Sequence, residues 1–431
     1  MIRTVLGSRF GEVLSPPAWN IPDATRHPDR EIPNPKFQTP SKSEIPRGNA
    51  PNRHIRVCDL EFRSLGFVWN LDLGIWNLER QFVLEWSFKV RAAKMYAPGD
   101  IRLVEMKKPI CGKGEVLVRV RAVGICASDV HYFRDGRIGD AVVTEPFILG
   151  HEFAGEIAEV GPGVTNVKPG DRVAVEPSIP CHKCDVCAAG DHNLCRNVKF
   201  CGTPPYHGSM CEFLAWPAWL VEPIPDSMSL GEAAMLEPLA VGVYAVEISP
   251  DIRAKTVGVL GVGAIGLSIL QAAKVAGCGE SFVTDFFPKR LELARKLGAD
   301  RAFLVDDHIS ETIKEATGGR GLDVVFEAAG ENEAVCQATE MVRPSGWVII
   351  GGIPREDRMT ITASVVRRKG VTIRLLRRSK DTLRRSIRLV EDGKVDVASY
   401  ITHRFPLDRV AEAFEIARDR KDISVRVLVE L

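Results

Sequence analysis

The sequence predicts an α/β protein in which a β-rich half is followed by a half of alternating strands and helices. Between about residues 89 and 240, short apolar runs are separated by Pro and Gly turns, which indicates a small, barrel-like β domain. Between about residues 241 and 376, strand patterns alternate with helical ones, which is typical of a doubly wound parallel sheet. The first strand of this second half also runs into a glycine-rich turn.

The composition is that of an ordinary globular protein of two or three domains. Of the 431 residues, 45% are hydrophobic and 26% are charged. A net charge of +1 gives no argument for a nucleic-acid or membrane partner, and no uncharged apolar run of about 18 residues predicts a membrane span. Four of the 11 cysteines are closely grouped, which favours metal binding in a reducing compartment over a disulfide scaffold. We therefore expect a cytoplasmic protein that acts on a small molecule.

Residues 1–88 differ from the rest of the chain. The stretch from 16 to 57 is rich in Pro and polar residues and cannot bury enough apolar surface to offset its ordering entropy, so we expect disorder. Residues 60–88 are aromatic but follow neither a 2.0 nor a 3.6 period, and they either pack on the domain surface or do not belong to the mature protein. No apolar segment with a small-residue cleavage site predicts secretion.

The strands of the first half follow from runs of alternating apolar and charged residues. The expected strands cover 90–96, 101–105, 115–123, 155–160 and 172–176. Pro-Gly turns at 98–99, 162–163 and 169–170 separate them.

A thiol, an imidazole and a carboxylate lie close together in this half, at Cys126, His151 and Glu152. All three are ligands that zinc accepts, and three protein ligands leave the open position of a catalytic zinc. Ser128 and His131 are near enough to Cys126 in the sequence to move a proton off a bound substrate. The alternative is a buried cysteine with two surface histidines.

Four further cysteines form a second group. The spacing C-x2-C-x2-C places three thiolates on one side of a loop, and a fourth can complete a tetrahedron without an open position, as in a structural zinc site. An iron–sulfur cluster or free thiols are the alternatives. The four are Cys181, Cys184, Cys187 and Cys195. We expect His182 and His192, in the same segment, to be exposed loop residues.

The second half begins with a predicted strand at 256–260, and a helix is predicted over 267–276. The glycines between them allow a tight turn and the close approach of a pyrophosphate to the helix N-terminus. A strand over 281–284 ends at Asp285, whose carboxylate is placed to bond an adenosine ribose and to repel a 2′-phosphate, so NAD is favoured over NADP. Arg290 weighs against that preference unless it lies on the adenine side, as we expect. The predicted cofactor residues are Gly261, Gly263, Ile265, Gly266, Asp285 and Arg290.

Further strands are expected at 301–305, 322–327 and 346–351. From residue 377 to residue 431 the chain is expected to return to the first domain, with a helix over 406–418 and a last strand over 425–431. A parallel sheet that binds no nucleotide is the alternative interpretation of this half.

From about residue 89 to residue 431 the chain resembles the zinc-dependent medium-chain dehydrogenases, and most closely their polyol branch, the sorbitol and xylitol dehydrogenases. The motifs that carry the resemblance lie at 124–133, 136–139, 149–152, 181–195, 203–205, 236–239 and 402–407. The resemblance stops before residue 89. It implies a GroES-like catalytic domain over 89–240, a Rossmann NAD-binding domain over 241–376, a return to the catalytic domain over 377–431, and a homodimer or homotetramer.

The resemblance also assigns site residues. It implies a catalytic zinc held by Cys126, His151 and Glu152, with Glu237 close by as a direct ligand or through water, and a structural zinc on the four cysteines. The substrate residues that it implies are Tyr132, Phe200, Thr203 and Arg378. Ser379 departs from the family, because members often have an aromatic residue after the matching arginine.

The implied activity is oxidation of a secondary hydroxyl of a polyol to a ketose, with hydride transfer to NAD. Ser128 would accept the proton and His131 would pass it on. The nearest alternatives are zinc dehydrogenases of simple alcohols, threonine or a sugar acid. A more distant one is a non-catalytic nucleotide-binding protein, which would be expected to have lost a metal ligand, yet the sequence retains all of them.

Overall fold

The computed structural model describes residues 89–419 and 424–431, so the expectations for residues 1–88 lie outside this part of the chain. The β-rich half contains β1 (Lys89–Ala97), β2 (Asp100–Lys107), β3 (Glu115–Gly124), β4 (Arg137–Ile138), β5 (Ala141–Val142), β6 (Phe147–Ile148), β7 (Glu152–Val160), β8 (Arg172–Val175), β9 (Ser178–Ile179), β10 (Lys199–Phe200), β11 (Phe213–Pro217) and β12 (Val221–Pro223). Its helices are α2 (Ala127–Asp135), α3 (Asp185–Ala188), α4 (Leu230–Ala234) and α5 (Leu236–Glu247).

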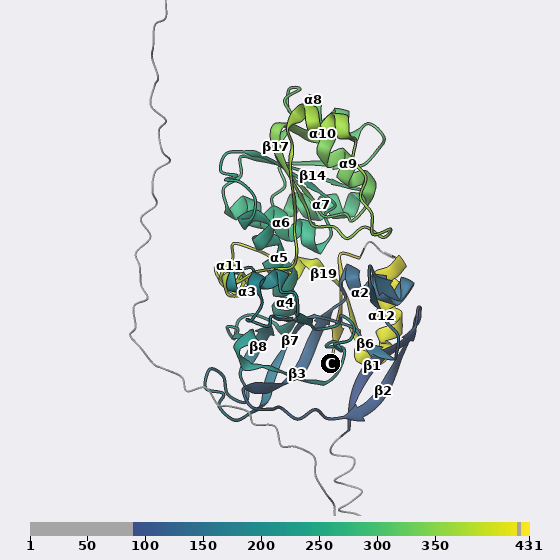
Figure 1. Cartoon of the computed structure of the whole chain (residues 1–431), viewed down its shortest axis with the longest axis vertical. Coiled ribbons are helices and arrows are strands. Elements are labelled where there is room, and N and C mark those ends of the chain that lie inside the picture. The colour runs from purple at the N-terminus through teal and green to yellow at the C-terminus, as the bar shows by residue number, and fades with distance from the viewer. Residues whose placement is uncertain (1–88, 420–423) are drawn as a thin grey trace, which may run out of the picture. The chain divides into compact units, whose positions relative to one another are not determined.

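The central sheet of this half has seven strands in the order β12-β8-β7-β3-β20-β19, with β11 also paired to β3. Its last two strands, β19 (Ile401–Pro406) and β20 (Arg426–Glu430), come from the C-terminal segment, as the sequence predicts. In Figure 1 the C-terminus accordingly lies among the blue strands of the first half. A smaller sheet, β2-β1-β6, completes this half.

The parallel-sheet half follows a repeating strand-helix order. Its elements are β13 (Thr256–Leu260), α6 (Ala264–Val275), β14 (Glu280–Asp285), α7 (Pro288–Lys296), β15 (Arg301–Leu304), α8 (Ile309–Ala316), β16 (Leu322–Glu327), α9 (Asn332–Met341), β17 (Val342–Ile350), α10 (Ala363–Lys369) and β18 (Thr372–Leu375). All neighbours in its sheet, β15-β14-β13-β16-β17-β18, pair in parallel. Every residue of β16 is buried, which fits a strand covered on both faces. The predicted α/β fold class is therefore confirmed.

The C-terminal segment corrects one expectation. The helix predicted over 406–418 begins later, as α12 (Val410–Asp419), after a short 3-10 turn at Leu407–Arg409. Pro406 ends β19 with an extended backbone, at φ −68° and ψ 157°, so it cannot start the helix. The preceding helix of this segment is α11 (Leu383–Glu391), and a 3-10 turn, Ala398–Tyr400, leads into β19.

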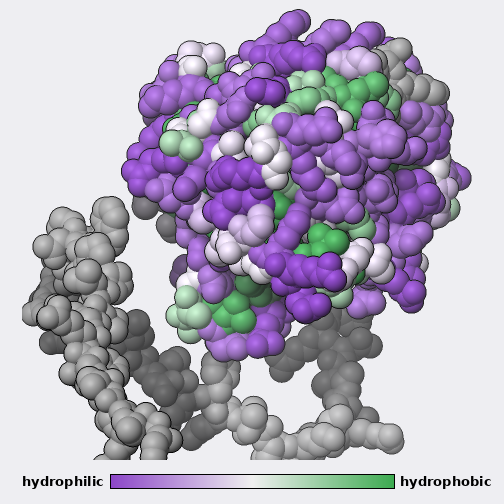
Figure 2. All heavy atoms as spheres, turned by 90° about the horizontal axis from the view of Figure 1, so that it is seen from above, coloured by the Kyte–Doolittle hydropathy of each residue, from purple (hydrophilic) through white to green (hydrophobic). Residues whose placement is uncertain are grey.

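The face of the molecule drawn in Figure 2 is mainly hydrophilic, with hydrophobic side chains gathered in small separate areas. Among the helices of residues 89–419 and 424–431, none is long and apolar enough to cross a membrane.

Candidate active site

Strand register brings the two predicted metal-binding motifs together. β3 and β7 are antiparallel neighbours, and the last residue of β3, Gly124, pairs with the first residue of β7, Glu152. Cys126 lies two residues after the end of β3 and is the N-cap of α2, while His151 directly precedes β7. The candidate ligand atoms of Cys126, His151 and Glu152 consequently lie within 4.8 Å of one another.

Two residues that the sequence analysis gave no role hold this cluster in place. Asp129 is fully buried, and its two carboxylate oxygens accept the backbone N–H groups of Cys126, at 2.9 Å, and Gly150, at 3.0 Å. One of them also lies 3.6 Å from His151 Nδ1. Arg426 of β20 forms an ion pair with Glu152 at 3.0 Å and donates to the Ile125 carbonyl at 2.8 Å. Groups that orient metal ligands in this way commonly tune a metal site.

The polar atoms of the cluster fit a bound cation. His151 Nδ1 and both carboxylate oxygens of Glu152 are buried and form no hydrogen bond within the described residues. Buried polar atoms are rarely left without partners, because losing water without replacement costs free energy. A thiolate, an imidazole and a carboxylate suit zinc, so the chemistry of the donor set agrees with the predicted catalytic zinc.

Glu237 lies in the first turn of α5 and is buried. Burial raises its pKa to about 8, and the charges of Glu152 and Glu176 add to the effect against that of His151. A divalent cation nearby would favour the ionised carboxylate. Glu237 is not part of the group whose ligand atoms converge.

The predicted substrate residues gather beside this cluster. The Phe200 ring lies 5.2 Å from the His151 ring, and the Arg378 guanidinium lies over Phe200 at 4.2 Å. Tyr132 is buried, which raises the pKa of its hydroxyl, and it bonds the Thr203 side chain. Within residues 89–419 and 424–431 the Arg378 guanidinium has no hydrogen bond or ion pair, so its donors remain available to a ligand. Burial lowers its pKa to about 10, which still leaves it charged at neutral pH.

The two predicted proton-transfer residues lie on α2 next to the cluster. Ser128 is in the first turn of the helix, and His131 is partly buried one turn later. The His131 Nδ1 atom lies 3.0 Å from an Arg134 nitrogen. Arginine can only donate, so Nδ1 accepts this bond and the neutral imidazole carries its proton on Nε2.

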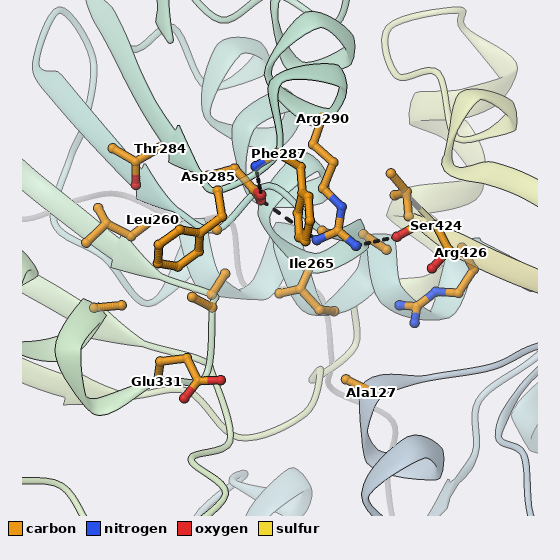
Figure 3. A pocket seen from close by; sticks show the side chains of 18 of the residues that line it. Ala127, Leu260, Ile265, Thr284, Asp285, Phe287, Arg290, Glu331, Ser424 and Arg426 are labelled. Atoms are coloured by element: carbon orange, nitrogen blue, oxygen red, sulfur yellow. Dashed lines mark hydrogen bonds and ion pairs between the residues drawn. The ribbon is translucent and has the colours of Figure 1, made fainter. Parts of the chain in front are cut away.

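A cavity of about 450 Å³ joins the two halves at the carboxyl ends of the parallel strands. Figure 3 shows its lining, with Ala127 of α2 facing residues of the parallel-sheet half. Gly261 has a φ of +84°, and a Cβ on Gly266 would lie 1.9 Å from the Gly261 carbonyl oxygen, so both positions require glycine. A Cβ on Gly263 would meet nothing within 4 Å, which leaves open space at the N-terminus of α6, where an anion is favoured.

Asp285 closes the far end of this cavity. Its carboxylate accepts the backbone N–H groups of Val262, at 2.9 Å, and Phe287, at 3.0 Å, which fix its orientation. Arg290 lies 3.8 Å from Asp285, stacks over Phe287 and donates to the Ser424 carbonyl (Figure 3). Ile265 lines the same cavity. The structure thus places five of the six predicted cofactor residues around a single cavity, and the sixth, Gly266, lies in the adjoining turn of α6.

The four grouped cysteines converge separately. Their sulfur atoms lie within 4.8 Å of one another, and none of the described cysteines forms a disulfide. Backbone N–H groups point at the sulfurs, as at Cys195, which accepts from Cys181 at 3.2 Å and from Asn197 at 3.3 Å. A backbone hydrogen bond from Lys183 contributes most to lowering the pKa of Cys181 to about 6. Such thiolate-stabilising contacts fit a closed structural zinc site.

The two histidines of the four-cysteine lobe, residues 181–197, differ in their exposure. His182 is exposed, as predicted. The prediction for His192 is wrong, because its ring lies 3.2 Å from the Asp381 carboxylate and is partly buried. The partner lies far away in the sequence, and no local pattern identifies it.

Comparisons with known proteins agree with this arrangement. A model described as the alcohol dehydrogenase GroES-like domain matches residues 112–226, and one described as zinc-binding dehydrogenase matches residues 264–392. A sorbitol dehydrogenase of Bacillus subtilis (strain 168) is 38% identical over 341 residues, which cover 79% of this chain and 97% of that protein. An L-idonate 5-dehydrogenase of Vitis vinifera is 37% identical over 333 residues, which cover 75% of this chain and 90% of that protein. The solved structure of a zinc-binding dehydrogenase from Sinorhizobium meliloti 1021, bound to NADP, has a TM-score of 0.73 at 29% identity and covers 80% of this chain and 99% of that one.

Proposed function

The chain belongs to the zinc-dependent medium-chain dehydrogenases, and on that premise we propose that it oxidises a secondary hydroxyl of a polyol to a ketose, with hydride transfer to NAD. The observation that carries the proposal is the position of the Cys126, His151 and Glu152 cluster beside a group of hydrogen-bonding side chains. Zinc on these ligands supplies Lewis-acid polarisation of a substrate hydroxyl, and the hydride chemistry belongs to the cofactor.

In this proposal the residues of α2 handle the proton. Ser128 accepts the proton of the reacting hydroxyl, and His131 passes it on. The Arg134 contact supports this role, because it fixes the tautomer of His131 with the proton on Nε2. Asp129 and Arg426 keep the ligands oriented but touch no reacting atom.

The polar side chains beside the metal cluster support a substrate with several hydroxyl groups. Tyr132, Thr203 and Arg378 offer donors and acceptors beside the metal cluster, and Glu237 adds a carboxyl group. A site built to bond hydroxyls penalises a substrate that lacks them, because its own polar groups then stay unsatisfied. We therefore expect a specificity constant for a C5 or C6 polyol that is about a hundredfold or more above that for ethanol, the equivalent of a few lost hydrogen bonds.

The test is an activity panel with NAD and sorbitol, xylitol, ethanol and threonine. Arg378→Ala should narrow the gap between polyol and ethanol, chiefly by weakening the polyol, while leaving the zinc content unchanged. Comparable specificity constants for ethanol and every polyol would contradict the proposed substrate class and leave only the zinc dehydrogenase family.

The choice of NAD rests on Asp285. Its carboxylate is fixed at the cavity and would repel a 2′-phosphate, although a related protein of known structure binds NADP. Asp285→Ser should raise the Michaelis constant for NAD about tenfold, the effect of losing one or two hydrogen bonds, and should reduce the preference over NADP. A wild-type enzyme that prefers NADP would contradict this choice.

A sugar acid is the second candidate substrate. The planar fork of Arg378 fits a carboxylate with two parallel hydrogen bonds, and one relative is named an L-idonate 5-dehydrogenase. Adding an aldonate such as L-idonate to the panel distinguishes the two candidates, because Arg378→Ala should then cost more for the acid than for the polyol.

A further inference from the structure

A five-residue segment, Arg377 to Asp381, which we call the strap, places Arg378 over Phe200 beside the Cys126 cluster. It joins β18 to α11 and contains only charged residues and a serine. Two of its five residues, none of which is glycine, have left-handed backbone conformations: Arg378 at φ 56° and Asp381 at φ 57°. Such conformations are unfavourable for these residue types and persist only where surrounding contacts hold them.

The contacts that hold the strap come from the four-cysteine lobe. Asn193, which is 3% exposed, donates from Nδ2 to the Arg377 carbonyl at 2.9 Å. Lys380 bonds the Asp191 carboxylate at 2.9 Å, and Asp381 lies 3.2 Å from His192. Three consecutive lobe residues, just before the ligand Cys195, therefore engage residues on both sides of Arg378.

Little apolar packing is available to hold the strap in addition to these polar contacts. A second cavity, of about 300 Å³, lies between lobe and strap and is lined by Asn193, His192, Ser379 and Asp381. Ser379 donates to Glu176, which lines the same cavity, over a long distance of 3.3 Å. The strap has no apolar side chain of its own, and apart from the stacking of Arg378 on Phe200 it depends on its polar contacts for its position.

We propose that the four-cysteine lobe positions Arg378 for substrate binding, with Asn193 as the principal positioning residue and the Lys380–Asp191 pair as the second. The lobe then contributes to substrate selectivity in addition to stability. This inference rests on the proposed function in one respect, the role of Arg378 in binding the polyol. Neither Asn193 nor Lys380 touches the reacting atoms, so both act through Arg378.

The test uses Asn193→Ala in the full-length, zinc-loaded enzyme. We expect the Michaelis constant for sorbitol to rise about tenfold, the effect of losing one buried hydrogen bond. The kcat, the Michaelis constant for NAD and the zinc content should stay nearly unchanged. The Michaelis constant for ethanol should not change, because its single hydroxyl does not bond Arg378. Lys380→Met should raise the sorbitol constant about threefold and Lys380→Arg should restore it, since an arginine can still pair with Asp191.

Arg196→Ala is the matched control. Arg196 lies in the same lobe beside Cys195, but its side chain pairs with exposed Asp185 and does not contact the strap. Removing it should leave the sorbitol constant unchanged. A control variant that raises this constant as much as Asn193→Ala would overturn the proposal, because the effect would then reflect the lobe in general.

Hydrogen exchange provides a readout that needs no substrate. Backbone amides of residues 376–382 should exchange at least about tenfold faster in Asn193→Ala than in the wild type, with residues 181–187 unchanged. Unchanged exchange in the strap together with an unchanged sorbitol constant overturns the inference. If Asn193→Ala loses zinc or fails to fold, the Lys380 pair decides by the same two measurements. A wild-type enzyme that does not oxidise polyols refutes the proposed function, whereas the exchange result still tests the positioning.

Discussion

The two sulfur-containing clusters of the chain differ in how the fold builds them. The Cys126 cluster takes its ligands from the segment that follows β3 and from the start of the neighbouring strand β7. It is fixed by Asp129 and by Arg426 of the C-terminal strand. The four-cysteine cluster is formed by a single segment, and the hydrogen bonds to its sulfurs come from residues of that same segment. A cluster built by long-range contacts depends on the whole fold, whereas a local one needs little beyond its own loop.

This difference also separates the chemistry. The Cys126 cluster mixes three types of donor, leaves buried oxygen and nitrogen atoms without hydrogen bonds within the described residues, and borders the large cavity through Cys126. The lobe presents four equivalent thiols, which saturate a tetrahedral metal. An open position is useful for catalysis, and a closed one is useful for holding chain segments together.

The strongest test of the comparison is Cys126→Ser. Loss of a metal ligand at the open site should reduce kcat by about a thousandfold or more, which corresponds to several kcal/mol of lost charge stabilisation. The fold should persist, because β3 and β7 keep their backbone pairing. Steady-state turnover and circular dichroism measure the two effects. Appreciable turnover in this variant would show that the Cys126 cluster is not the catalytic one.

Asp129→Asn should give the next largest effect. The amide keeps the size of the side chain but can no longer accept two backbone N–H groups with its two terminal atoms, and it removes the charge near His151. Activity or zinc affinity should fall about ten- to a hundredfold, as is usual for groups that orient metal ligands. Zinc titration with a competing chelator measures the affinity. Wild-type affinity and activity would mean that the backbone alone orients Cys126 and His151.

Cys181→Ser should act on stability. The variant should lose about one zinc per chain, and its thermal midpoint should fall by roughly 5–10 °C, as expected for a loss of a few kcal/mol in a domain of this size. The kcat of the folded fraction should change little compared with that of Cys126→Ser. Elemental analysis and calorimetry check both points. If both variants lost activity while keeping full metal content, the division into catalytic and structural sites would be wrong.

Deletion of residues 1–85 should have the smallest effect. The described strands that build both clusters begin at Lys89, and the family models match only from residue 112 onward. Turnover, zinc content and thermal midpoint should stay close to those of the full chain. Loss of soluble, active protein would show that the aromatic stretch at 60–88 supports the β-rich half.

The sequence was informative wherever chemistry depends on neighbours along the chain. The glycine turn from Gly261 to Gly266 and the four-cysteine lobe are local motifs with a fixed physical purpose, and the strand 256–260 is as predicted. The clustering of Cys126 with His151 and Glu152 was also predictable from their donor types. Its geometric cause, the pairing of Gly124 with Glu152, is a property of strand register and appears only in the structure.

The functional residues that could not be predicted from the sequence share one property: their partners are distant along the chain. Arg426 lies in a correctly expected strand, but nothing local indicates an ion pair with Glu152. In the sequence, Asn193 and His192 look like ordinary loop residues, but in the structure they contact the segment around Arg378. Pro406 was misjudged for a different reason, because its extended conformation belongs to the strand before the helix.

The position of β20 between β3 and β19 has a consequence for biosynthesis. The ribosome makes β3 and β7 early, but Arg426 is made only after the entire parallel-sheet half. Domains tend to fold as they emerge, so that half can form while Glu152 still lacks its cationic partner. Until β20 is inserted, the nascent chain holds an uncompensated carboxylate where the completed protein has a neutral ion pair, and metal loading of a finished site must follow the last steps of translation.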